Sequence, residues 1–242
     1  MAGHSHAKNV KRRKDAQNAK KSLSFSKLSH AVYLAALGGA DQEKNYQLKI
    51  AVKKASQGSL PKERIENAIN RAQGGGEAKA MSQIRYNATV GDVIFIIEVL
   101  TDNKNRSISN IKNIFTKNGG SLSDSNSLEF MFDQIGTLEY SKSDDNNYRK
   151  DDIEMAALET DAQNVTENES SFIIETLPSH LHQTLSSISD EFKTPSSMSL
   201  TWKAKNPIEI INEEKADKIR NICDLLDSDD DVSNFYHNII KL

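Results

Sequence analysis

The spacing of apolar residues changes at the glycine triplet 74–76, and this change constrains the architecture more than any other feature. Before the triplet, apolar side chains recur every three or four residues in three short runs, which contain Leu28, Leu48 and Ile65. Each run ends near a glycine, a residue that favours the left-handed backbone at the end of a helix. The sequence therefore predicts three short helices and a small helical domain.

After the triplet, the apolar pattern becomes typical of strands. Ile84–Val90 and the β-branched run Val93–Thr101 predict two strands, and the second is apolar enough to be a buried central strand. A helical face follows over Ile108–Phe115, and a hairpin around Gly136 is expected to join Leu128–Phe132 to Thr137–Tyr140. This order of elements indicates an α+β unit.

A second unit of the same kind follows the polar segment 141–150. It consists of helical patterns and strands in alternation: Ile153–Ala162, Ser171–Leu177, a face at Leu181, Leu185 and Ile188, and Met198–Lys205. The C-terminal part predicts a helix through Ile219 and Leu226, an acidic turn at Asp227–Asp231 and a strand at Val232–His237. Because a lone helix and strand cannot bury themselves, we expect them to complete the first unit.

The expected fold class is α+β and multi-domain. An N-terminal three-helix domain is followed by two α/β domains of the ferredoxin-like type, one of them completed by the C-terminal helix and strand. The expected domains are a basic arm at 1–24, a helical domain at 25–76, a discontinuous α/β domain at 80–136 plus 208–242, and a second α/β domain at 137–207.

Composition excludes several classes of protein. The 242 residues contain no run of about 18 apolar residues, so no membrane-spanning helix is expected. The single cysteine, Cys223, excludes a disulfide framework and a thiolate zinc site within one chain. The charged residues at the start are not followed by the apolar segment of a secretory signal, so none is expected.

The formal net charge of −3 conceals a strong asymmetry. Residues 1–72 hold 15 lysines and arginines against 5 acidic residues, a charge of +10, whereas residues 73–242 hold 16 against 29, a charge of −13. A split of this size indicates a basic module that faces a polyanion, joined to an acidic body.

The candidate nucleic-acid-binding residues lie in the basic arm and the start of the helical domain. Arginines can contact phosphates with two donors, lysines act as point charges, and each neutralised phosphate releases counterions. The alternatives are a solvated charge run and a mitochondrial presequence, because residues 1–40 contain one acidic residue, Asp15. The candidates are His4, Lys8, Asn9, Lys11, Arg12, Arg13, Lys14, Lys20, Lys21 and Lys27.

The sequence offers no case for an enzyme, a cofactor, a small-molecule substrate or a metal site. His4 and His6 provide two metal ligands without a third, and His180 and His182 are interpreted as a helix entry. The turn Asp227–Asp231 lacks the alternation of a calcium loop and is interpreted as solvated, and Cys223 as core. Phosphate-loop, nucleophile-elbow and zinc-protease motifs are missing from the sequence.

Several separated motifs resemble the YebC/PmpR family. They are the opening Met1–Ser5, the run Asn9–Lys20, Phe25–Lys27, Leu60–Ile69, Glu98–Arg106, Lys117–Gly120 and Val232–Asn238, and they occur in the family's order across the chain. The resemblance implies a helical N-terminal domain and two α/β domains. It also implies a regulator of gene expression, since bacterial members have been called DNA-binding transcriptional regulators. Mitochondrial relatives include the translational activator of cytochrome c oxidase subunit one.

The chain departs from the family pattern at two places. His6-Ala7 stands where the family usually has Lys-Trp, and Tyr86–Asp92 replaces the usual glycine- and proline-rich loop.

The resemblance and the charge pattern together favour a ribosome-associated translational activator that eases synthesis of difficult sequences. Family members have been placed on the ribosome, and distributed basic contacts suit structured ribosomal RNA. The alternative is a DNA-binding transcriptional regulator, although the segment Lys62–Arg71 carries Glu63 and Glu66 on the face that would read a groove. The expected compartment is the mitochondrial matrix, or the cytoplasm if the protein is bacterial, and no membrane partner is expected.

Overall fold

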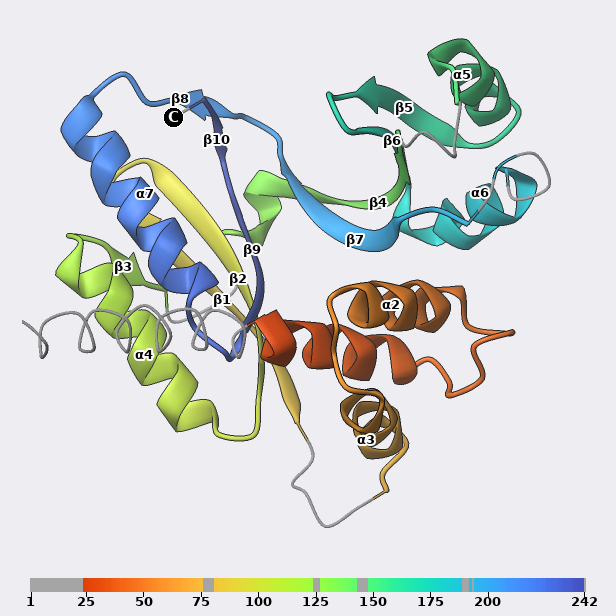
Figure 1. Cartoon of the computed structure of the whole chain (residues 1–242). Coiled ribbons are helices and arrows are strands. Elements are labelled where there is room, and N and C mark those ends of the chain that lie inside the picture. The colour runs from red at the N-terminus through yellow and green to blue at the C-terminus, as the bar shows by residue number, and fades with distance from the viewer. Residues whose placement is uncertain are drawn as a thin grey trace, which may run out of the picture.

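The computed structural model describes residues 24–75, 81–123, 127–142, 148–188, 192 and 194–241. These residues form a layer of helices and two antiparallel sheets, each with helices on one face (Figure 1). The expected α+β architecture, with a helical N-terminal part and two α/β parts, is confirmed.

The helical domain contains a first helix over residues 24–36, α2 (Tyr46–Gln57) and α3 (Lys62–Ala72). Asn45 joins the first two, because its side-chain oxygen accepts from the Leu48 amide while its Nδ2 donates to the carbonyls of Ala35 and Gly39, each at 2.8 Å. Such capping satisfies backbone groups that a helix end leaves open. The three helices bury a common core that consists of Val32, Tyr33, Ala36, Leu48, Ala55, Leu60, Ile65 and Ala68, together with Leu100 of the neighbouring sheet.

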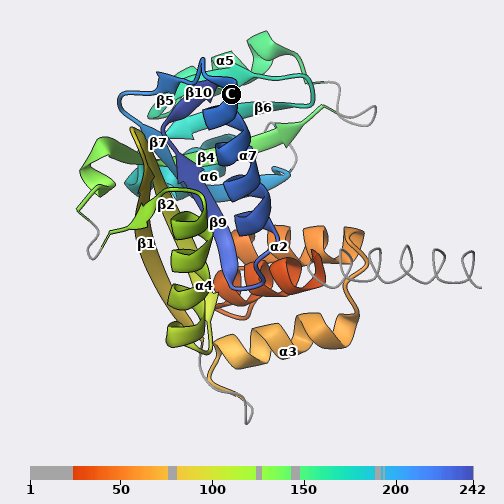
Figure 2. The same cartoon turned by 90° about the vertical axis from the view of Figure 1, so that its left-hand side faces the viewer.

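The first sheet has the strand order β3-β1-β2-β9. Its strands are β1 (Ser82–Val90), β2 (Val93–Thr101), β3 (Ser121–Leu122) and β9 (Val232–His237). The helices α4 (Lys104–Lys117) and α7 (Glu213–Asp227) cover one face of this sheet (Figure 2). The core between them includes Phe95 and Phe115, whose ring centroids are 5.2 Å apart.

The C-terminal strand completes the first sheet as predicted. β9 has the predicted bounds and pairs antiparallel with β2, the central apolar strand. A short parallel pair, β8 (Ile208–Glu209) with β10 (Ile239–Lys241), lies beside it and was not predicted.

The second sheet has the order β5-β6-β4-β7. Its strands are β4 (Phe132–Ser141), β5 (Ala162–Glu167), β6 (Ser171–Thr176) and β7 (Ser197–Ala204). The helices α5 (Lys150–Leu158) and α6 (Leu181–Ile188) pack on it, and the short 3-10 helices Glu129–Met131 and Pro178–His180 precede β4 and α6.

Two predictions in this region are wrong. The expected hairpin around Gly136 is instead one continuous strand, β4, so residues 132–136 pair with β7 in the second sheet. A Cβ on Gly136 would lie 3.0 Å from Leu181 Cβ and from Thr176 Cγ2, so the glycine permits a close approach rather than a turn. The helix predicted to reach Ala162 ends at Leu158, and the polar strand β5 follows it.

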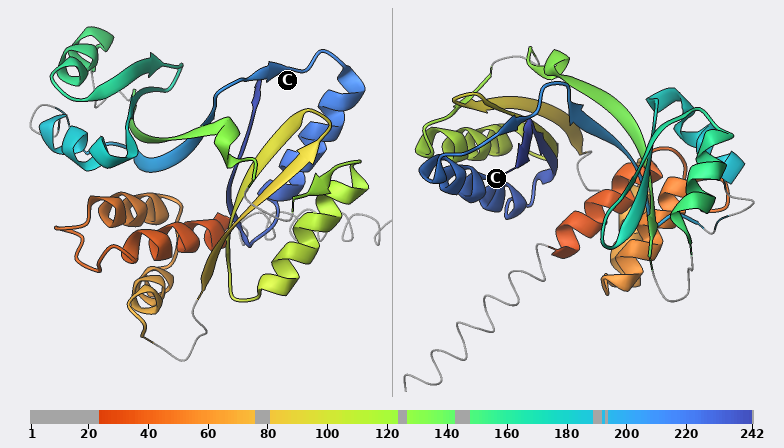
Figure 3. Two further views of the ribbon diagram at one scale, coloured as in Figure 1. Left: turned by 180° about the vertical axis from the view of Figure 1, so that it is seen from behind. Right: turned by 90° about the horizontal axis from the view of Figure 1, so that it is seen from above.

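The two sheets meet at a polar joint. The guanidinium of Arg85 on β1 lies 4.8 Å from the ring centroid of Trp202 on β7 and forms an ion pair of 2.8 Å with Glu129. Trp202 Nε1 donates to Glu98 Oε1 at 3.2 Å. The helical domain lies against both sheets (Figure 3). Leu100 of β2 lies in its core, and Ile50 of α2 lies in the core of the second sheet.

Within the described ranges, no helix is long and apolar enough to cross a membrane.

Candidate nucleic-acid interface

Of the ten predicted nucleic-acid-binding residues, the structure describes Lys27. His4, Lys8, Asn9, Lys11, Arg12, Arg13, Lys14, Lys20 and Lys21 lie outside the described residues. Lys27 stands in the first turns of the first helix, and its ammonium group lies 3.2 Å from a carboxylate oxygen of Asp227 at the end of α7. The ion pair links the helical domain to the first α/β domain and partly compensates the charge of Lys27.

The acidic turn next to Lys27 is more ordered than predicted. Asp227 and Asp230 are exposed, but Asp231 is only 7% exposed. Its carboxylate accepts from Arg106 Nη2 at 2.8 Å and from the hydroxyl of Ser107 at 2.7 Å. The interpretation of the whole turn as solvated is therefore wrong for Asp231.

Asp231 stays ionised in this buried place because of its partners. Burial opposes the charged form, but the hydrogen bonds from Arg106 and Ser107 outweigh it, so the pKa of Asp231 is lowered. The turn after α7 thus contains a buried, paired charge at Asp231 beside the exposed carboxylate of Asp230.

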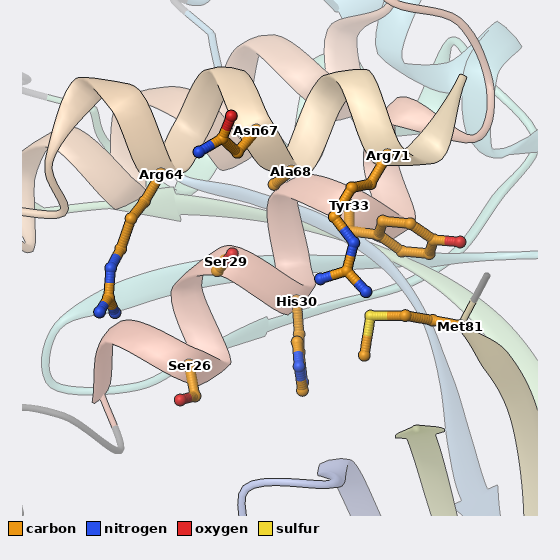
Figure 4. A pocket seen from close by; sticks show the side chains of 9 residues that line it. All are labelled: Ser26, Ser29, His30, Tyr33, Arg64, Asn67, Ala68, Arg71 and Met81. Atoms are coloured by element: carbon orange, nitrogen blue, oxygen red, sulfur yellow. The ribbon is translucent and has the colours of Figure 1, made fainter. Parts of the chain in front are cut away.

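A groove of about 240 Å³ separates the first helix from α3. Polar side chains from both helices line it, as Figure 4 shows. On each helix the lining positions follow one face, with the spacing i, i+3, i+4 and i+7. These residues are Ser26, Ser29, His30 and Tyr33 from the first helix, Arg64, Asn67, Ala68 and Arg71 from α3, and Met81 ahead of β1.

The two arginines stand at opposite ends of the groove (Figure 4). Arg64 is exposed, and its guanidinium carbon lies 5.9 Å from the ring centroid of Phe25. Arg71 is half-buried, and its guanidinium points toward His30 and Met81. The groove therefore offers two cationic ends with hydroxyl and amide groups between them.

His30 forms part of the groove floor. Its Nδ1 is buried and has no hydrogen-bond partner among the described residues. The pKa of His30 is lowered, mainly by burial and also by Arg71, although Asp231, Asp230 and Asp102 act in the opposite direction. The imidazole is thus neutral near pH 7.

Further cations lie on the outer surface of the helical domain. Lys53 and Lys54 of α2 are exposed and, within the part of the chain that is described, pair with no carboxylate. Lys62 of α3 lies 3.6 Å from Glu66. The surface of α3 therefore mixes both signs, while α2 presents uncompensated positive charge.

A family model described as "TACO1/YebC protein N-terminal domain" matches residues 5–75, and one described as "TACO1/YebC second and third domain" matches residues 81–239. The chain belongs to the TACO1/YebC family. The two matches meet between the helical domain and the first sheet.

Relatives of this TACO1/YebC protein cover nearly the whole chain. A probable transcriptional regulatory protein of Mycoplasmopsis synoviae is 36% identical, with 99% of each chain covered. One of Maricaulis maris is 37% identical, with 98% of this chain and 95% of the relative covered. One of Anoxybacillus flavithermus is 35% identical, with 99% and 98% covered.

A solved structure supports the same architecture. A conserved hypothetical protein from Aquifex aeolicus superposes with a TM-score of 0.80 at 28% identity, covering 92% of this chain and 91% of the other. The TACO1/YebC fold thus accounts for both α/β domains and for the helices that precede them.

Burial, with Asp227 and Asp224 nearby, raises the pKa of the half-buried Cys223 to about 11, so the thiol is protonated at neutral pH. In the described ranges, no three histidine, cysteine, aspartate or glutamate side chains gather to hold a metal ion.

Sequence reasoning missed the groove. Its signal was present, since Ser26, Ser29, His30 and Tyr33 share one helical face and Arg64, Asn67 and Arg71 share another. The apolar faces of these helices predicted the core. Whether their two polar faces meet depends on the tertiary fold, which local sequence patterns do not encode.

Proposed function

We propose that this TACO1/YebC protein is a non-enzymatic, nucleic-acid-binding regulator of gene expression that docks on ribosomal RNA and activates translation of difficult sequences. The observation that carries the proposal is the separation of charge, +10 over residues 1–72 against −13 over the remainder. Phosphates attract the first part and repel the second, so the protein meets a polyanion with its N-terminal part.

The surface of the helical domain supports backbone contacts rather than base reading. A recognition helix presents several base-reading side chains on one exposed face. On α3, Glu63 and Glu66 are exposed beside Lys62 and Arg64. Carboxylates at these positions would repel the phosphates that flank a DNA groove, whereas structured RNA is bound largely through its shape, its phosphates and its 2′-hydroxyls.

A second candidate function is transcriptional regulation on DNA. It is favoured by the printed names of the relatives from Mycoplasmopsis synoviae, Maricaulis maris and Anoxybacillus flavithermus, each a probable transcriptional regulatory protein. The same basic arm would supply the phosphate contacts, because these contacts carry no sequence information.

The proposed activity takes place where the host translates, in the cytoplasm of a bacterium or the matrix of a mitochondrion. The test is sedimentation of cell lysate through a sucrose gradient at low and at high salt, with the full chain detected by an antibody. The wild type is expected to co-sediment with ribosomes at low salt and to leave them at high salt.

Matched variants sharpen the test. Arg12→Gln/Arg13→Gln removes two arm charges and is expected to release the protein from ribosomes. Arg149→Gln/Lys150→Gln removes two exposed charges at the start of α5 and is expected to leave co-sedimentation unchanged. Sedimentation of the wild type free of ribosomes, together with a footprint on a defined DNA duplex, would contradict the proposal and favour the second candidate.

A further inference from the structure

We propose that the groove between the first helix and α3 binds the backbone of single-stranded RNA, with Arg64 and Arg71 on two phosphates and Ser26, Ser29 and Asn67 on the sugars between them. This inference rests on the proposed function and names a binding site within it. The groove is a separate site from the basic arm, whose residues 1–23 lie outside the described part of the chain.

The spacing of the arginines selects an extended ligand. Arg64 and Arg71 are seven positions apart on α3, so their Cα atoms are separated by two helical turns, about 10 Å along the axis. Figure 4 shows their guanidinium groups at opposite ends of the groove rather than converging on one point. One phosphate cannot engage both guanidinium groups, but two phosphates of one strand can.

The volume of the groove also favours a polymer. Sites that enclose a small molecule typically measure about 300–1,000 Å³ and surround most of the ligand. This groove measures about 240 Å³, and Arg64 and Asn67 of its lining are exposed. It therefore accommodates part of a strand whose remainder lies outside.

The groups between the arginines suit ribose hydroxyls. Ser26 and Ser29 each offer a hydroxyl, and Asn67 offers an amide that donates and accepts. The side chain of His30 lines the same groove. The 2′-hydroxyl is the group by which a protein distinguishes RNA from DNA. The lining therefore predicts a preference for RNA over the matching DNA strand.

The surroundings orient the strand along α3. Asp102, Asp230 and Asp231 act on His30 from the first α/β domain, and of these Arg106 pairs with both Asp231 and Asp102. On this side the exposed Asp230 repels phosphates, whereas the side formed by α3 carries both arginines. Lys27 of the first helix pairs with Asp227 of that domain at 3.2 Å.

The experiment measures binding of fluorescein-labelled 12-nucleotide poly-U and of the matching deoxy strand to the full chain by anisotropy, over a range of KCl concentrations. Arg64→Gln/Arg71→Gln is expected to weaken RNA binding at least tenfold. The slope of log affinity against log salt is expected to become shallower by about 1.4, because two phosphate contacts to a single strand are lost. Asn67→Ala is expected to lower the RNA-to-DNA affinity ratio at least threefold and to leave the salt slope unchanged.

Two controls separate the groove from general electrostatics and from misfolding. Lys53→Gln/Lys54→Gln removes the same charge from the exposed face of α2 and is expected to weaken binding less than threefold. Because Arg71 is half-buried, Arg64→Gln alone is tested as well, with the circular dichroism spectrum and Tm compared with wild type. The single variant is expected to give half of the change in slope.

The outcomes distinguish this inference from the proposed function. If both groove variants bind RNA like wild type while Arg12→Gln/Arg13→Gln does not, the inference is overturned and the proposed function stands. If wild type binds neither strand and no ribosomal RNA, both are overturned. Equal losses for the groove pair and the α2 pair, or competition by 1 mM AMP as effective as by the oligonucleotide, would also overturn the inference.

Discussion

Arg106 and Asp231 are 125 positions apart in the sequence and form an ion pair between α4 and the turn that precedes β9. Arg106 Nη2 lies 2.8 Å from Asp231 Oδ1, and Arg106 Nε lies 3.2 Å from Oδ2. Arg106 belongs to the first turn of α4, and Asp231 directly precedes β9. The pair therefore joins the end of the chain to the sheet that it completes.

Removing the Asp231 charge is expected to destabilise the protein. Asp231→Asn loses the charge-assisted hydrogen bonds, and because Arg106 is half-exposed we expect a loss of about 1–3 kcal/mol in the free energy of unfolding. Urea titration followed by circular dichroism measures the loss. The control is Asp230→Asn, an exposed neighbour, which is expected to change stability by less than about 0.5 kcal/mol. Equal stability of the two variants would contradict this role.

The same pair predicts a pH dependence. The pKa of Asp231 is lower in the folded protein than its ordinary value near 3.9, so its stabilisation is present above about pH 4 and is lost as pH falls through the folded pKa. The difference in unfolding free energy between wild type and Asp231→Asn is therefore expected to shrink as the pH falls below about 4. Urea titrations at several pH values measure it. A difference that grows in acid would contradict the assignment.

The fluorescence of Trp202 reports on the joint between the two sheets. Trp202 is the one tryptophan in the sequence, and it is held between Arg85 and Glu98. Arg85→Ala removes the cation above the ring and the ion pair to Glu129, with an expected loss of about 1–2 kcal/mol and a red shift of tryptophan emission. Lys104→Ala, at an exposed site on α4, is the control. An unchanged emission spectrum for Arg85→Ala would argue against the joint.

The close approach at Gly136 is expected to tolerate no side chain without cost. Gly136→Ala places a methyl group 3.0 Å from Leu181 and Thr176, so we expect a loss of about 1–3 kcal/mol from overpacking. The matched control is Gly38→Ala, whose added Cβ would meet its nearest neighbour at 3.5 Å, an ordinary contact. Thermal unfolding compares the two. A Tm of Gly136→Ala at or above that of wild type would refute the packing argument.

Much of the fold could be predicted because local patterns agreed with it. The run Val93–Thr101 is apolar throughout, and it is the central strand β2. The strand Val232–His237 was placed correctly because a strand after a lone amphipathic helix needs a sheet to join. In both places the apolar residues must be buried. Placing β2 at the centre of the first sheet and β9 beside it buries them.

Other features depended on contacts that no local pattern encodes. Gly136 resembles a turn residue in the sequence, but the packing of Leu181 and Thr176 across the sheet requires it. The strand β5 is polar, with Val165 as its partly buried apolar residue besides Ala162, and it exists through its pairing with β6. In the sequence, Asp231 cannot be distinguished from the exposed aspartates beside it. In the fold it is buried and paired with Arg106.

One feature of the candidate site could be predicted from the sequence and another could not. Its charge was evident from composition, since lysines and arginines gather in residues 1–72. The groove was not evident, because it arises where the polar face of the first helix meets that of α3 across the helical domain. The tertiary fold brings the polar faces of the first helix and α3 together, and the groove is formed by both helices.

The central claim is that cations at the N-terminal end bind a nucleic-acid backbone by displacing counterions. The most direct measurement is the affinity of the full chain for a structured ribosomal RNA fragment at KCl concentrations from 50 to 400 mM. We expect a slope of log affinity against log salt of about −4 or steeper, and a markedly shallower slope after glutamine replaces Lys8, Lys11, Arg12, Arg13, Lys14, Lys20 and Lys21. An affinity that is independent of salt and unchanged by these substitutions would contradict the claim.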